Sequence, residues 1–504
     1  MERFLGIDLG AGSLKASVVL RDGRCLASAS ASVPTMKPFA GASEQDPQEW
    51  WLALCRAVRA VMEQAGNPAL TAIALSAGAH SSVLSDAQGR AIRPAIMWND
   101  QRSRAQVGRL RDTAGKRIAA LSCNSVSPTW TLPHLAWLVE NEPDSLAAAH
   151  RLTPAKDWLR GRLTDDWLTE PMDAVGLMLF DPAAGTWSEE LAALAGISTK
   201  ILPPVVPSLS LAGHVTGRAA AETGLAAGTP VVAGVSDTAA EALGAGMTQA
   251  GMGVVKLATA ATLSCVATNP EPSKTLVSYP YLPEGRWFWI TGTNSCASAH
   301  AWLRETMFSS GGGTALDYAA MEALAEQVPA GSNGLYFHPY LNGERAPHWD
   351  PDLRGSLAGM TFQHGPGHFM RAFYEGVAYS LADILRQFNA ADVRFERLRI
   401  TGGGARSRMW RQILADVLET PIELPESADA SFGCALVAGL GVGAFASVAD
   451  LQRAVRIVAS HAPDPNSSAV YREGFATYRD IHAALQDINH RISARERGEP
   501  RSRN

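Results

Sequence analysis

The pattern of apolar and polar positions at the start of the chain predicts a sheet that begins with a hairpin. Residues 4–33 (FLGIDLGAGSLKASVVLRDGRCLASASASV) contain three apolar runs, which are separated by a Gly-rich break and by Asp22-Gly23. Asp-Gly between apolar runs is a strong hairpin signal, so the strands on either side are expected to pair antiparallel. Because the Gly-rich break joins two strands rather than a strand and a helix, the pattern excludes a Rossmann dinucleotide site.

A helix and a further group of strands are predicted next. Asp46-Pro47 indicates a helix start, and apolar residues recur at helical spacing from there to Gly66. Residues 71–103 (TAIALSAGAHSSVLSDAQGRAIRPAIMWNDQRS) then read as three strands, with a loop that contains His80. Polar residues gather where these strands end, which is typical of a substrate site.

A second hairpin begins near the middle of the chain. Residues 231–246 (VVAGVSDTAAEALGAG) read as an apolar strand and an Ala-rich helix, and residues 251–269 (GMGVVKLATAATLSCVATN) as strand, small-residue turn and strand. This layout repeats that of the opening hairpin, which indicates two duplicated lobes. The expected domains are an N-terminal lobe over residues 1–248, a C-terminal lobe over residues 249–490 and a disordered polar tail over residues 491–504.

Composition narrows the class of protein. Hydrophobic residues make up 46% of the 504 positions, charged residues 18%, and the formal net charge is -5. This balance is ordinary for a globular protein and gives no electrostatic footprint for binding nucleic acid. The six cysteines show neither metal-ligand nor disulfide spacing, and Asp8 interrupts the apolar N-terminal segment that an export signal would need. We therefore expect a cytoplasmic protein.

One uncharged segment is long enough to cross a bilayer. Residues 430–449 (ASFGCALVAGLGVGAFASVA) are mostly Ala and Gly rather than large apolar residues. A buried helix with close backbone packing is favoured over a membrane span, and no membrane association is expected.

Three turns carry residues that could do chemistry, and each has a structural alternative. The glycines at 402–404 lie between a predicted strand and helix, where amides can bind phosphate or the glycines can serve backbone geometry alone. Asp8, followed by Gly10 and Gly12, could hold Mg²⁺ beside phosphates or cap a turn. Asp237 follows an apolar strand, so it could be a catalytic carboxylate or a helix N-cap.

Motifs in order over roughly residues 4 to 445 resemble the FGGY family of carbohydrate kinases, and most closely its xylulose kinase branch. Each motif alone is modestly specific, but their joint order is strong. The resemblance implies an α/β fold of the actin-like ATPase (ribonuclease H-like) type, with duplicated lobes around a central cleft that binds Mg-ATP. The motifs are GIDLGAGSLK, MWNDQR, PAKDWLRGRLT with TEPMDAVGLMLFD, GVSDTAA, PYLNGERAPHWDPDLRG and LRITGGGARSRMWRQILADVLETPIELPE.

The resemblance also assigns roles to residues. Asp237 is implied to be the base that takes a proton from the sugar hydroxyl, and Asp8 to lie at the phosphate and Mg²⁺ site, directly or through water. For His80 and Trp98, packing in the core is the alternative to sugar binding. The implied sugar-binding residues are Ala79, His80, Trp98, Asp100, Arg102 and Thr238, and the implied nucleotide-binding residues are Gly10, Gly12, Ser13, Lys15, Thr259, Gly402, Gly403, Gly404 and Ala405.

The chain departs from the family pattern at four places, one of which is His134 in LPHLAW, where the family has Lys and a small effect is expected. Gly78-Ala79 stands where xylulose kinases typically have Gln-Met, and Thr238 where they have Asn. The second phosphate turn, usually Gly-Thr-Ser-Gly, is replaced by residues 258–261 (ATAA), and Ala adopts positive φ less readily than Gly. Either ATP affinity is altered or the turn uses ordinary dihedral angles.

The expected function is ATP-dependent phosphorylation of a ketopentose, with D-xylulose as the first candidate. The alternatives are another pentulose, a polyol or a sugar acid as substrate, or a catalytically weak sugar-binding regulator on the same fold. An actin-like chaperone or filament protein is disfavoured because the sugar-pocket motifs are present. A small-molecule sugar and ATP are the expected partners, and a homodimer is the expected assembly.

Overall fold

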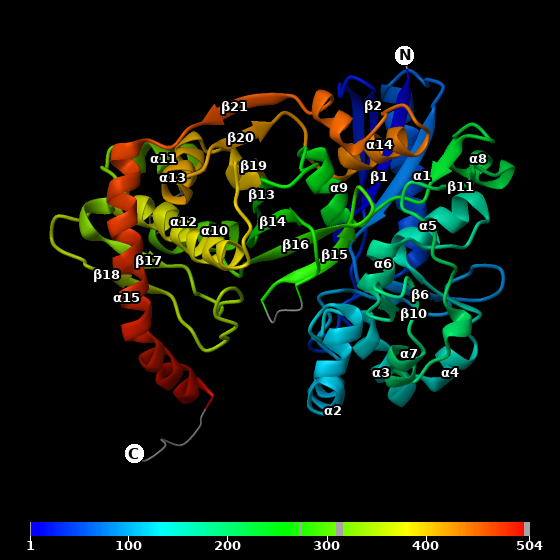
Figure 1. The fold of residues 1–504 in the computed structure, drawn as a ribbon, viewed down its shortest axis with the longest axis horizontal. Coiled ribbons are helices and arrows are strands. Elements are labelled where there is room, and N and C mark those ends of the chain that lie inside the picture. Colours follow the sequence, from blue (N-terminus) through cyan, green and yellow to red (C-terminus); the bar gives the residue numbers. More distant parts are fainter. Residues whose placement is uncertain (1, 272–274, 309–315, 498–504) are drawn as a thin grey trace. The chain divides into compact units, whose positions relative to one another are not determined.

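The structure is a computed structural model, which describes residues 2–271, 275–308 and 316–497. The chain forms two compact units (Figure 1), each with one large sheet. The sequence predicted one division at residue 248, whereas the chain enters the first unit again at two later points. The first unit comprises Met1–Thr248, Val266–Trp289 and Ser427–Arg456, and the second comprises Gln249–Cys265, Ile290–Glu426 and Ile457–Asn504.

The first unit is built on a six-stranded mixed sheet in the order β11-β12-β5-β1-β2-β3. The predicted hairpins are confirmed, since β1, β2 and β3 pair antiparallel, while β1 and β5 run parallel. Gly23 allows the second hairpin turn because its φ is 85°. The strands of this sheet are β1 (Arg3–Leu9), β2 (Ser13–Leu20), β3 (Cys25–Ser32), β5 (Ala72–Ala77), β11 (Leu211–His214) and β12 (Pro230–Val232).

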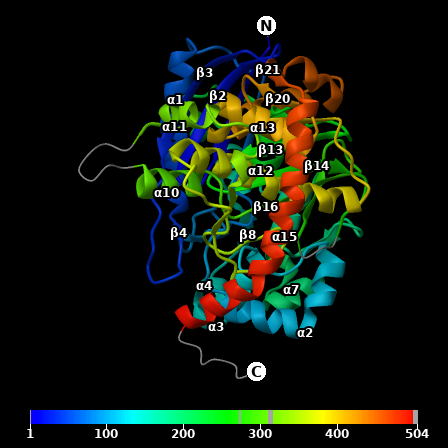
Figure 2. The same cartoon turned by 90° about the vertical axis from the view of Figure 1, so that its left-hand side faces the viewer.

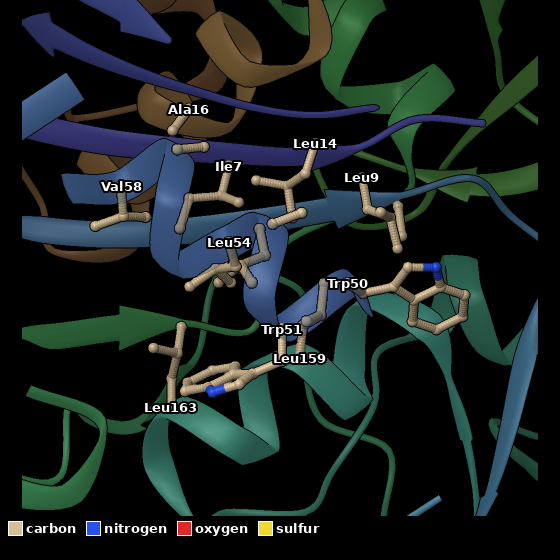
Figure 3. Packing of buried hydrophobic residues seen from close by; sticks show 14 of the residues in the cluster. Ile7, Leu9, Leu14, Ala16, Trp50, Trp51, Leu54, Val58, Leu159 and Leu163 are labelled. Carbon is tan, nitrogen blue, oxygen red and sulfur yellow. The ribbon is translucent and has the colours of Figure 1, made fainter. Parts of the chain in front are cut away.

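Helix α1 (Pro47–Gln64) covers one face of this sheet. As predicted, the Asp46 side chain caps it by accepting a hydrogen bond from the Gln48 amide, and Pro47 occupies the first turn. The apolar side of the helix packs on alternate residues of β1 and β2, and α5 (Ala155–Thr164) closes the same core. Figure 3 shows this packing, with labels on Ile7, Leu9, Leu14, Ala16, Trp50, Trp51, Leu54, Val58, Leu159 and Leu163.

Helix α14 (Ala430–Gly441) covers the opposite face, and it comprises the first 12 residues of the uncharged segment. The prediction of a buried helix with close backbone packing is confirmed, because a Cβ on Gly6 would overlap the Ser431 carbonyl oxygen. A Cβ on Gly433 would overlap the carbonyl oxygen of Ala240 in α9 (Asp237–Gly244). Among the helices of the described residues, none is long and apolar enough to cross a membrane.

The sheet of the second unit repeats the arrangement of the first. Strands β13 and β14 form an antiparallel hairpin, and β13 runs parallel to β19, as β1 does to β5. This shared layout supports the predicted duplication. The strands of this sheet follow one another in the order β15 (Val277–Tyr281), β16 (Arg286–Thr293), β14 (Ala261–Ala267), β13 (Met252–Leu257), β19 (Arg397–Thr401), β20 (Ile422–Pro425) and β21 (Ile457–His461).

Helix α15 (Pro465–Glu496) packs against α12 (Pro366–Ala390) and α13 (Arg408–Leu418), as Figure 2 shows. The sequence predicted disorder from residue 491, but the helix continues to Glu496. Ser493 is buried and donates a hydrogen bond to Asp352, which holds the last turns in place. The remainder of the predicted tail, residues 498–504, lies outside the described residues.

Shorter elements complete the two units. In the first unit these are β4 (Glu44–Gln45), β6 (Ser82–Ser85), β7 (Ala95–Ile96), α2 (Arg104–Ser122), α3 (Thr131–Asn141), α4 (Pro143–Ala147), β8 (Arg151–Pro154), α6 (Pro171–Gly176), β9 (Phe180–Asp181), β10 (Thr186–Trp187), α7 (Glu189–Ala195) and α8 (Gly217–Thr223). In the second unit these are α10 (Ala297–Met307), α11 (Tyr318–Glu326), β17 (Tyr336–His338) and β18 (Ser356–Ala358).

Candidate active site

Asp8 lies near the end of β1 and next to the end of β5. In the register of these parallel strands Asp8 is opposite Ser76, and the Ser76 hydroxyl donates to Asp8 Oδ1 over 2.7 Å. The following turn is closed by a hydrogen bond from the Gly10 amide to the Ser13 carbonyl oxygen. Burial, and then the negative charge of Asp237, raise the pKa of Asp8 to about 7, although the Ser76 hydrogen bond opposes the shift. The two carboxylates are therefore close enough to interact.

Asp237 is the first residue of α9, and it is not the helix cap that the sequence allowed. Ser236 occupies the N-cap position with extended backbone angles, and its side chain makes no capping hydrogen bond. The Asp237 carboxylate instead accepts a hydrogen bond of 2.7 Å from the Thr238 amide, through Oδ1. The N-terminal end of the helix dipole stabilises a negative charge at this position. The Thr238 hydroxyl lies 3.4 Å from that of Ser236.

The loop after β5 brings Gly78 close to Asp237, and the segment after β7 brings Trp98 close to Gly78. A Cβ built on Gly78 would lie 3.7 Å from Trp98 Cδ1 and 3.9 Å from both Trp98 Nε1 and Asp237 Oδ2. The Trp98 side chain is 42% exposed, so it is not a core residue. Ala79 follows in the same loop and lies beside Gly176 of α6. Gly78 thus lies between Trp98 and Asp237 within the first unit, with Ala79 next to it in the chain.

His80 occupies a strained position, with φ of 71°. Its Nδ1 lies 3.1 Å from the Gly176 carbonyl oxygen, and its Nε2 lies 2.7 Å from the Tyr279 hydroxyl. Trp130 packs edge-on against the imidazole, with 4.2 Å between ring centroids. Burial lowers the pKa of His80 to about 3, so the ring is neutral at physiological pH. His80 thus has one backbone partner, the Gly176 carbonyl oxygen, and one side-chain partner, the Tyr279 hydroxyl.

Asp100 and Arg102 lie in a buried ion-pair network rather than at a surface. Asp100 accepts hydrogen bonds from the Ser43 amide and from the Arg102 guanidinium. Arg102 also pairs with Glu44 at 2.8 Å, and Glu44 pairs with Arg93 at 2.5 Å. These contacts hold the segment that follows Trp98, so both residues support the loop from inside.

A second buried charge cluster holds the strand-to-helix connection that leads to Asp237. Lys156 Nζ donates to the Ala233 carbonyl oxygen at 2.9 Å and pairs with Asp157 at 3.0 Å and Asp173 at 3.3 Å. Burial lowers the pKa of Lys156, but these carboxylates together with Glu170 raise it overall, so the ammonium stays charged. Its position fixes the backbone just before α9.

Lys15 lies opposite Asp8 in the hairpin register of β1 and β2. Its ammonium pairs with Asp429 at 3.1 Å, and Asp429 caps α14 by accepting hydrogen bonds from the Ser431 and Phe432 amides. Gly12 is exposed at the tip of the same turn, and open space surrounds the position of its missing Cβ. In this structure the Lys15 ammonium is thus engaged by Asp429, and the tip of the turn at Gly12 is exposed.

The second unit carries the other expected nucleotide-binding residues. Thr259 accepts hydrogen bonds at its carbonyl oxygen from the Cys296 amide and the Ser298 hydroxyl, which fix the turn at residues 258–261. All residues of this turn are described, and none has a positive φ. The turn thus uses ordinary dihedral angles, which Ala adopts as readily as other residues.

The triple glycine follows β19 and leads into a short 3-10 turn, Gly403–Arg406, before α13 begins. Gly402 has a φ of 86°, and a Cβ there would overlap the Leu257 carbonyl oxygen. Glycine is therefore needed at this position for the backbone conformation and the close packing. Gly404 packs against Leu257 and Trp410, and Ala405 is buried. Gly403, by contrast, is exposed and has open space where a Cβ would lie.

Sequence reasoning missed several residues of the site. Ser76 could have been found by placing the strand at residues 72–77 parallel to β1, because the register then brings it to Asp8. Tyr279 is 199 positions from His80 in the sequence, and no local pattern indicates that they meet. Trp130 and Lys156 likewise become site neighbours only through the tertiary fold.

Comparison with known proteins identifies the family of the chain. Residues 3–244 match the N-terminal domain of the FGGY family of carbohydrate kinases, and residues 254–442 match its C-terminal domain. The chain belongs to the FGGY family of carbohydrate kinases. The FGGY protein is thus an ATP-dependent carbohydrate kinase, and the predicted actin-like ATPase fold with two sheet-containing lobes is confirmed.

Individual relatives of this FGGY kinase cover nearly its whole length. It is 31% identical to a xylulose kinase of Escherichia coli (strain K12), over 96% of this chain and 99% of that protein. The structure of a xylulose kinase from Rhodospirillum rubrum superposes with a TM-score of 0.90 at 29% identity, covering 97% of this chain and 100% of that one. A gluconokinase of Bacillus licheniformis is 29% identical over 96% of both chains. The proteins similar to this chain therefore include kinases named for two different substrates, xylulose and gluconate.

Proposed function

We propose that this FGGY kinase transfers the γ-phosphoryl group of ATP to a hydroxyl of a ketopentose such as D-xylulose. The observation that carries the proposal is the Asp237 carboxylate, which starts a helix beside Trp98 and the loop of Ala79 and His80. The xylulose kinases among its relatives support the choice of sugar.

Asp237 is proposed to act as the general base. Its carboxylate accepts the proton of the sugar hydroxyl while that oxygen attacks the γ-phosphorus, and the bond to the bridging oxygen of ADP breaks. The Thr238 amide holds Oδ1, and the dipole of α9 keeps the carboxylate ionised before transfer. Phosphoryl transfer needs little further covalent help, so positioning and charge supply the rest of the rate.

We propose that small-residue turns of each unit bind the nucleotide. In the first unit these are residues of the β1–β2 turn, and in the second the ATAA turn and the glycines after β19. Their amides, hydroxyls and one ammonium group suit phosphate oxygens. The proposed residues are Gly10, Gly12, Ser13, Lys15, Thr259, Gly402, Gly403, Gly404 and Ala405.

Mg²⁺ is proposed to bind at Asp8, directly or through water. The described residues contain no group of three or more His, Cys, Asp or Glu side chains that could hold a metal ion by themselves. This fits Mg²⁺, which is usually bound by one or two carboxylates together with water and substrate phosphates. When bound, the ion neutralises charge on the transferring phosphoryl group. The raised pKa of Asp8 indicates a carboxylate that a nearby cation would stabilise.

A sugar acid is the second candidate substrate, because a gluconokinase is also among the relatives. Ala79 and Thr238 present smaller or different side chains from the Met and Asn of the family pattern, so the identity of the sugar depends on the rest of the pocket. We propose Ala79, His80, Trp98 and Thr238 as its lining, with Asp100 and Arg102 as support.

The test is an ADP-release assay with the wild-type protein over ketopentoses, aldoses, polyols and sugar acids. The proposal expects one ketopentose, with D-xylulose first, to give the highest kcat/KM in the panel. Equal, background-level ADP release with every compound would contradict it and favour a sugar-binding regulator.

We further propose that the protein works as a cytoplasmic homodimer, as its sequence led us to expect. Size-exclusion chromatography with light scattering checks the assembly. A mass near twice the 53.5 kDa of the chain is expected, and a mass near 53.5 kDa at all concentrations would contradict it.

A further inference from the structure

The hydrogen bonds of His80 fix the position of its single ring proton. The Gly176 carbonyl oxygen can only accept, so the Nδ1 atom 3.1 Å away carries the proton. The left-handed backbone at His80, the edge contact with Trp130 and a hydrogen bond from the Thr131 hydroxyl to the His80 carbonyl oxygen hold the ring in this orientation. Nε2 therefore has a lone pair and no proton.

The proton of Tyr279 follows from this tautomer. Because Nε2 accepts, the Tyr279 hydroxyl 2.7 Å away must be the donor, and its only proton is committed to His80. Burial, together with the negative charges of Asp237 and Asp173, raises the pKa of Tyr279 well above its ordinary value, so the phenol stays neutral. The phenol oxygen can then offer only lone pairs to a third group.

A buried cluster of charged side chains around Lys156 includes Asp173, one of the carboxylates that raise the pKa of Tyr279. Asp173 is buried, and its Oδ2 lies 3.3 Å from Lys156 Nζ. Lys156 is itself fully buried and shared among three carboxylates, since Glu170 lies 3.7 Å away and Asp157 3.0 Å away. Arg160 is the second buried cation of the cluster and pairs with Asp157 at 2.8 Å, so carboxylates of the cluster engage both of its cations.

We propose that Tyr279 is a specificity-determining residue, whose hydroxyl oxygen accepts a hydrogen bond from a hydroxyl of an uncharged sugar and disfavours a carboxylate. A sugar hydroxyl can donate to this oxygen, whereas a carboxylate brings only lone pairs and a negative charge. This inference rests on the proposed function, and it deepens it by selecting uncharged ketoses and polyols over sugar acids.

Two tyrosines of β15 supply a matched pair of variants for the test. Tyr279→Phe removes the hydroxyl that donates to His80, whereas Tyr281→Phe removes an equally buried hydroxyl that donates to the Met247 carbonyl oxygen. Both changes keep the ring, so a general loss of packing would affect both variants. Circular dichroism checks whether each variant is folded.

The measurements are the KM values for D-xylulose and ATP, and calorimetric titration of D-xylulose and D-gluconate into each protein without ATP. For Tyr279→Phe we expect the KM and Kd for D-xylulose to rise about ten- to a hundredfold, with the KM for ATP unchanged. D-Gluconate should bind the wild type at least about tenfold more weakly than D-xylulose. Tyr279→Phe should lower this ratio of the Kd for D-gluconate to the Kd for D-xylulose. Tyr281→Phe should leave all of these values within about twofold of the wild type.

Two results would overturn the inference. One is a Kd for D-xylulose in Tyr279→Phe within about twofold of the wild type, and the other is tighter binding of D-gluconate than of D-xylulose by the wild type. Because calorimetry measures the Kd of the sugar without turnover, it tests the role of Tyr279 in sugar binding separately from catalysis. A wild type that binds D-xylulose selectively but releases no ADP would refute the proposed function and leave the role of Tyr279 supported. Should Tyr279→Phe not fold, tighter binding of D-gluconate than of D-xylulose by the wild type would still overturn the inference.

Discussion

At the scale of single residues, Asp8 carries a charge that the metal-free protein stabilises poorly. It is partly buried, and after Asp237 the carboxylates of Asp429 and Glu241 also raise its pKa. The Ser76 hydroxyl supplies only partial compensation. Such a group favours binding of a cation at the cost of stability in the protein without one.

This charge predicts a pH dependence of stability. The folded-state pKa of Asp8, about 7, lies above the ordinary value of 3.8, so the folded protein binds the proton more tightly than the unfolded chain. The contribution of Asp8 to stability is therefore lost as pH rises from about 4 through about 7. In metal-free buffer, Asp8→Asn should gain roughly 2 kcal/mol over the wild type between pH 5 and pH 8, after a discount for partial exposure.

Urea unfolding at several pH values measures this difference. Asp86→Asn is the control, because hydrogen bonds from Arg90 lower the pKa of that exposed carboxyl and leave it charged over the whole range. A difference between wild type and Asp8→Asn that stays constant from pH 5 to pH 8 would show that the Asp8 pKa is ordinary.

At the scale of elements, the site depends on helices that approach one another at glycine. Helix α14 packs on β1 at Gly6 and on α9 at Gly433, so the strand of Asp8 and the helix of Asp237 share one buried support. No flexible side chain lies between Gly433 and the Ala240 carbonyl oxygen, and an added methyl group must move the backbone.

Gly433→Ala is therefore expected to destabilise the protein by about 1–3 kcal/mol and to lower kcat, because α9 moves with Asp237. Gly108→Ala in α2 makes the same chemical change where open space surrounds the Cβ position, and it should be neutral or stabilise by up to about 1 kcal/mol. Chemical denaturation measures both variants. Equal stability of the two would contradict the packing argument.

The sequence predicted elements better than it predicted contacts. The Asp22-Gly23 hairpin, the Asp46-Pro47 helix start and the buried Ala-Gly helix follow from local rules, and all three are confirmed. Asp237 was expected as a possible cap because local patterns cannot separate N-cap from first helical residue, a difference of one position.

Contacts between distant parts of the chain could not be read in this way. The Tyr279–His80 pair and the Lys156 cluster depend on tertiary packing, which has no periodic signal in a single sequence. Ser76 is an intermediate case, because a correct strand pairing alone places it beside Asp8.

At the scale of the whole molecule, the two sheets share one arrangement of strands but carry different residues at their turns. Each has an antiparallel hairpin with a small-residue turn and a third strand parallel to the first. The first unit adds the two carboxylates and the proposed sugar pocket, and the second adds the glycines after β19. Duplication followed by divergence of the turns thus accounts for the kinase fold and for the separate proposed tasks of its units.

The central claim is that Asp237 is the base of a sugar kinase, and the kcat of Asp237→Asn tests it most directly. With the best sugar of the wild type, kcat should fall about 10²- to 10⁴-fold while calorimetry shows ATP binding unchanged. Glu241→Gln removes the same charge one turn further along α9 and should keep near-normal kcat. A folded Asp237→Asn protein with near-normal kcat would contradict the account.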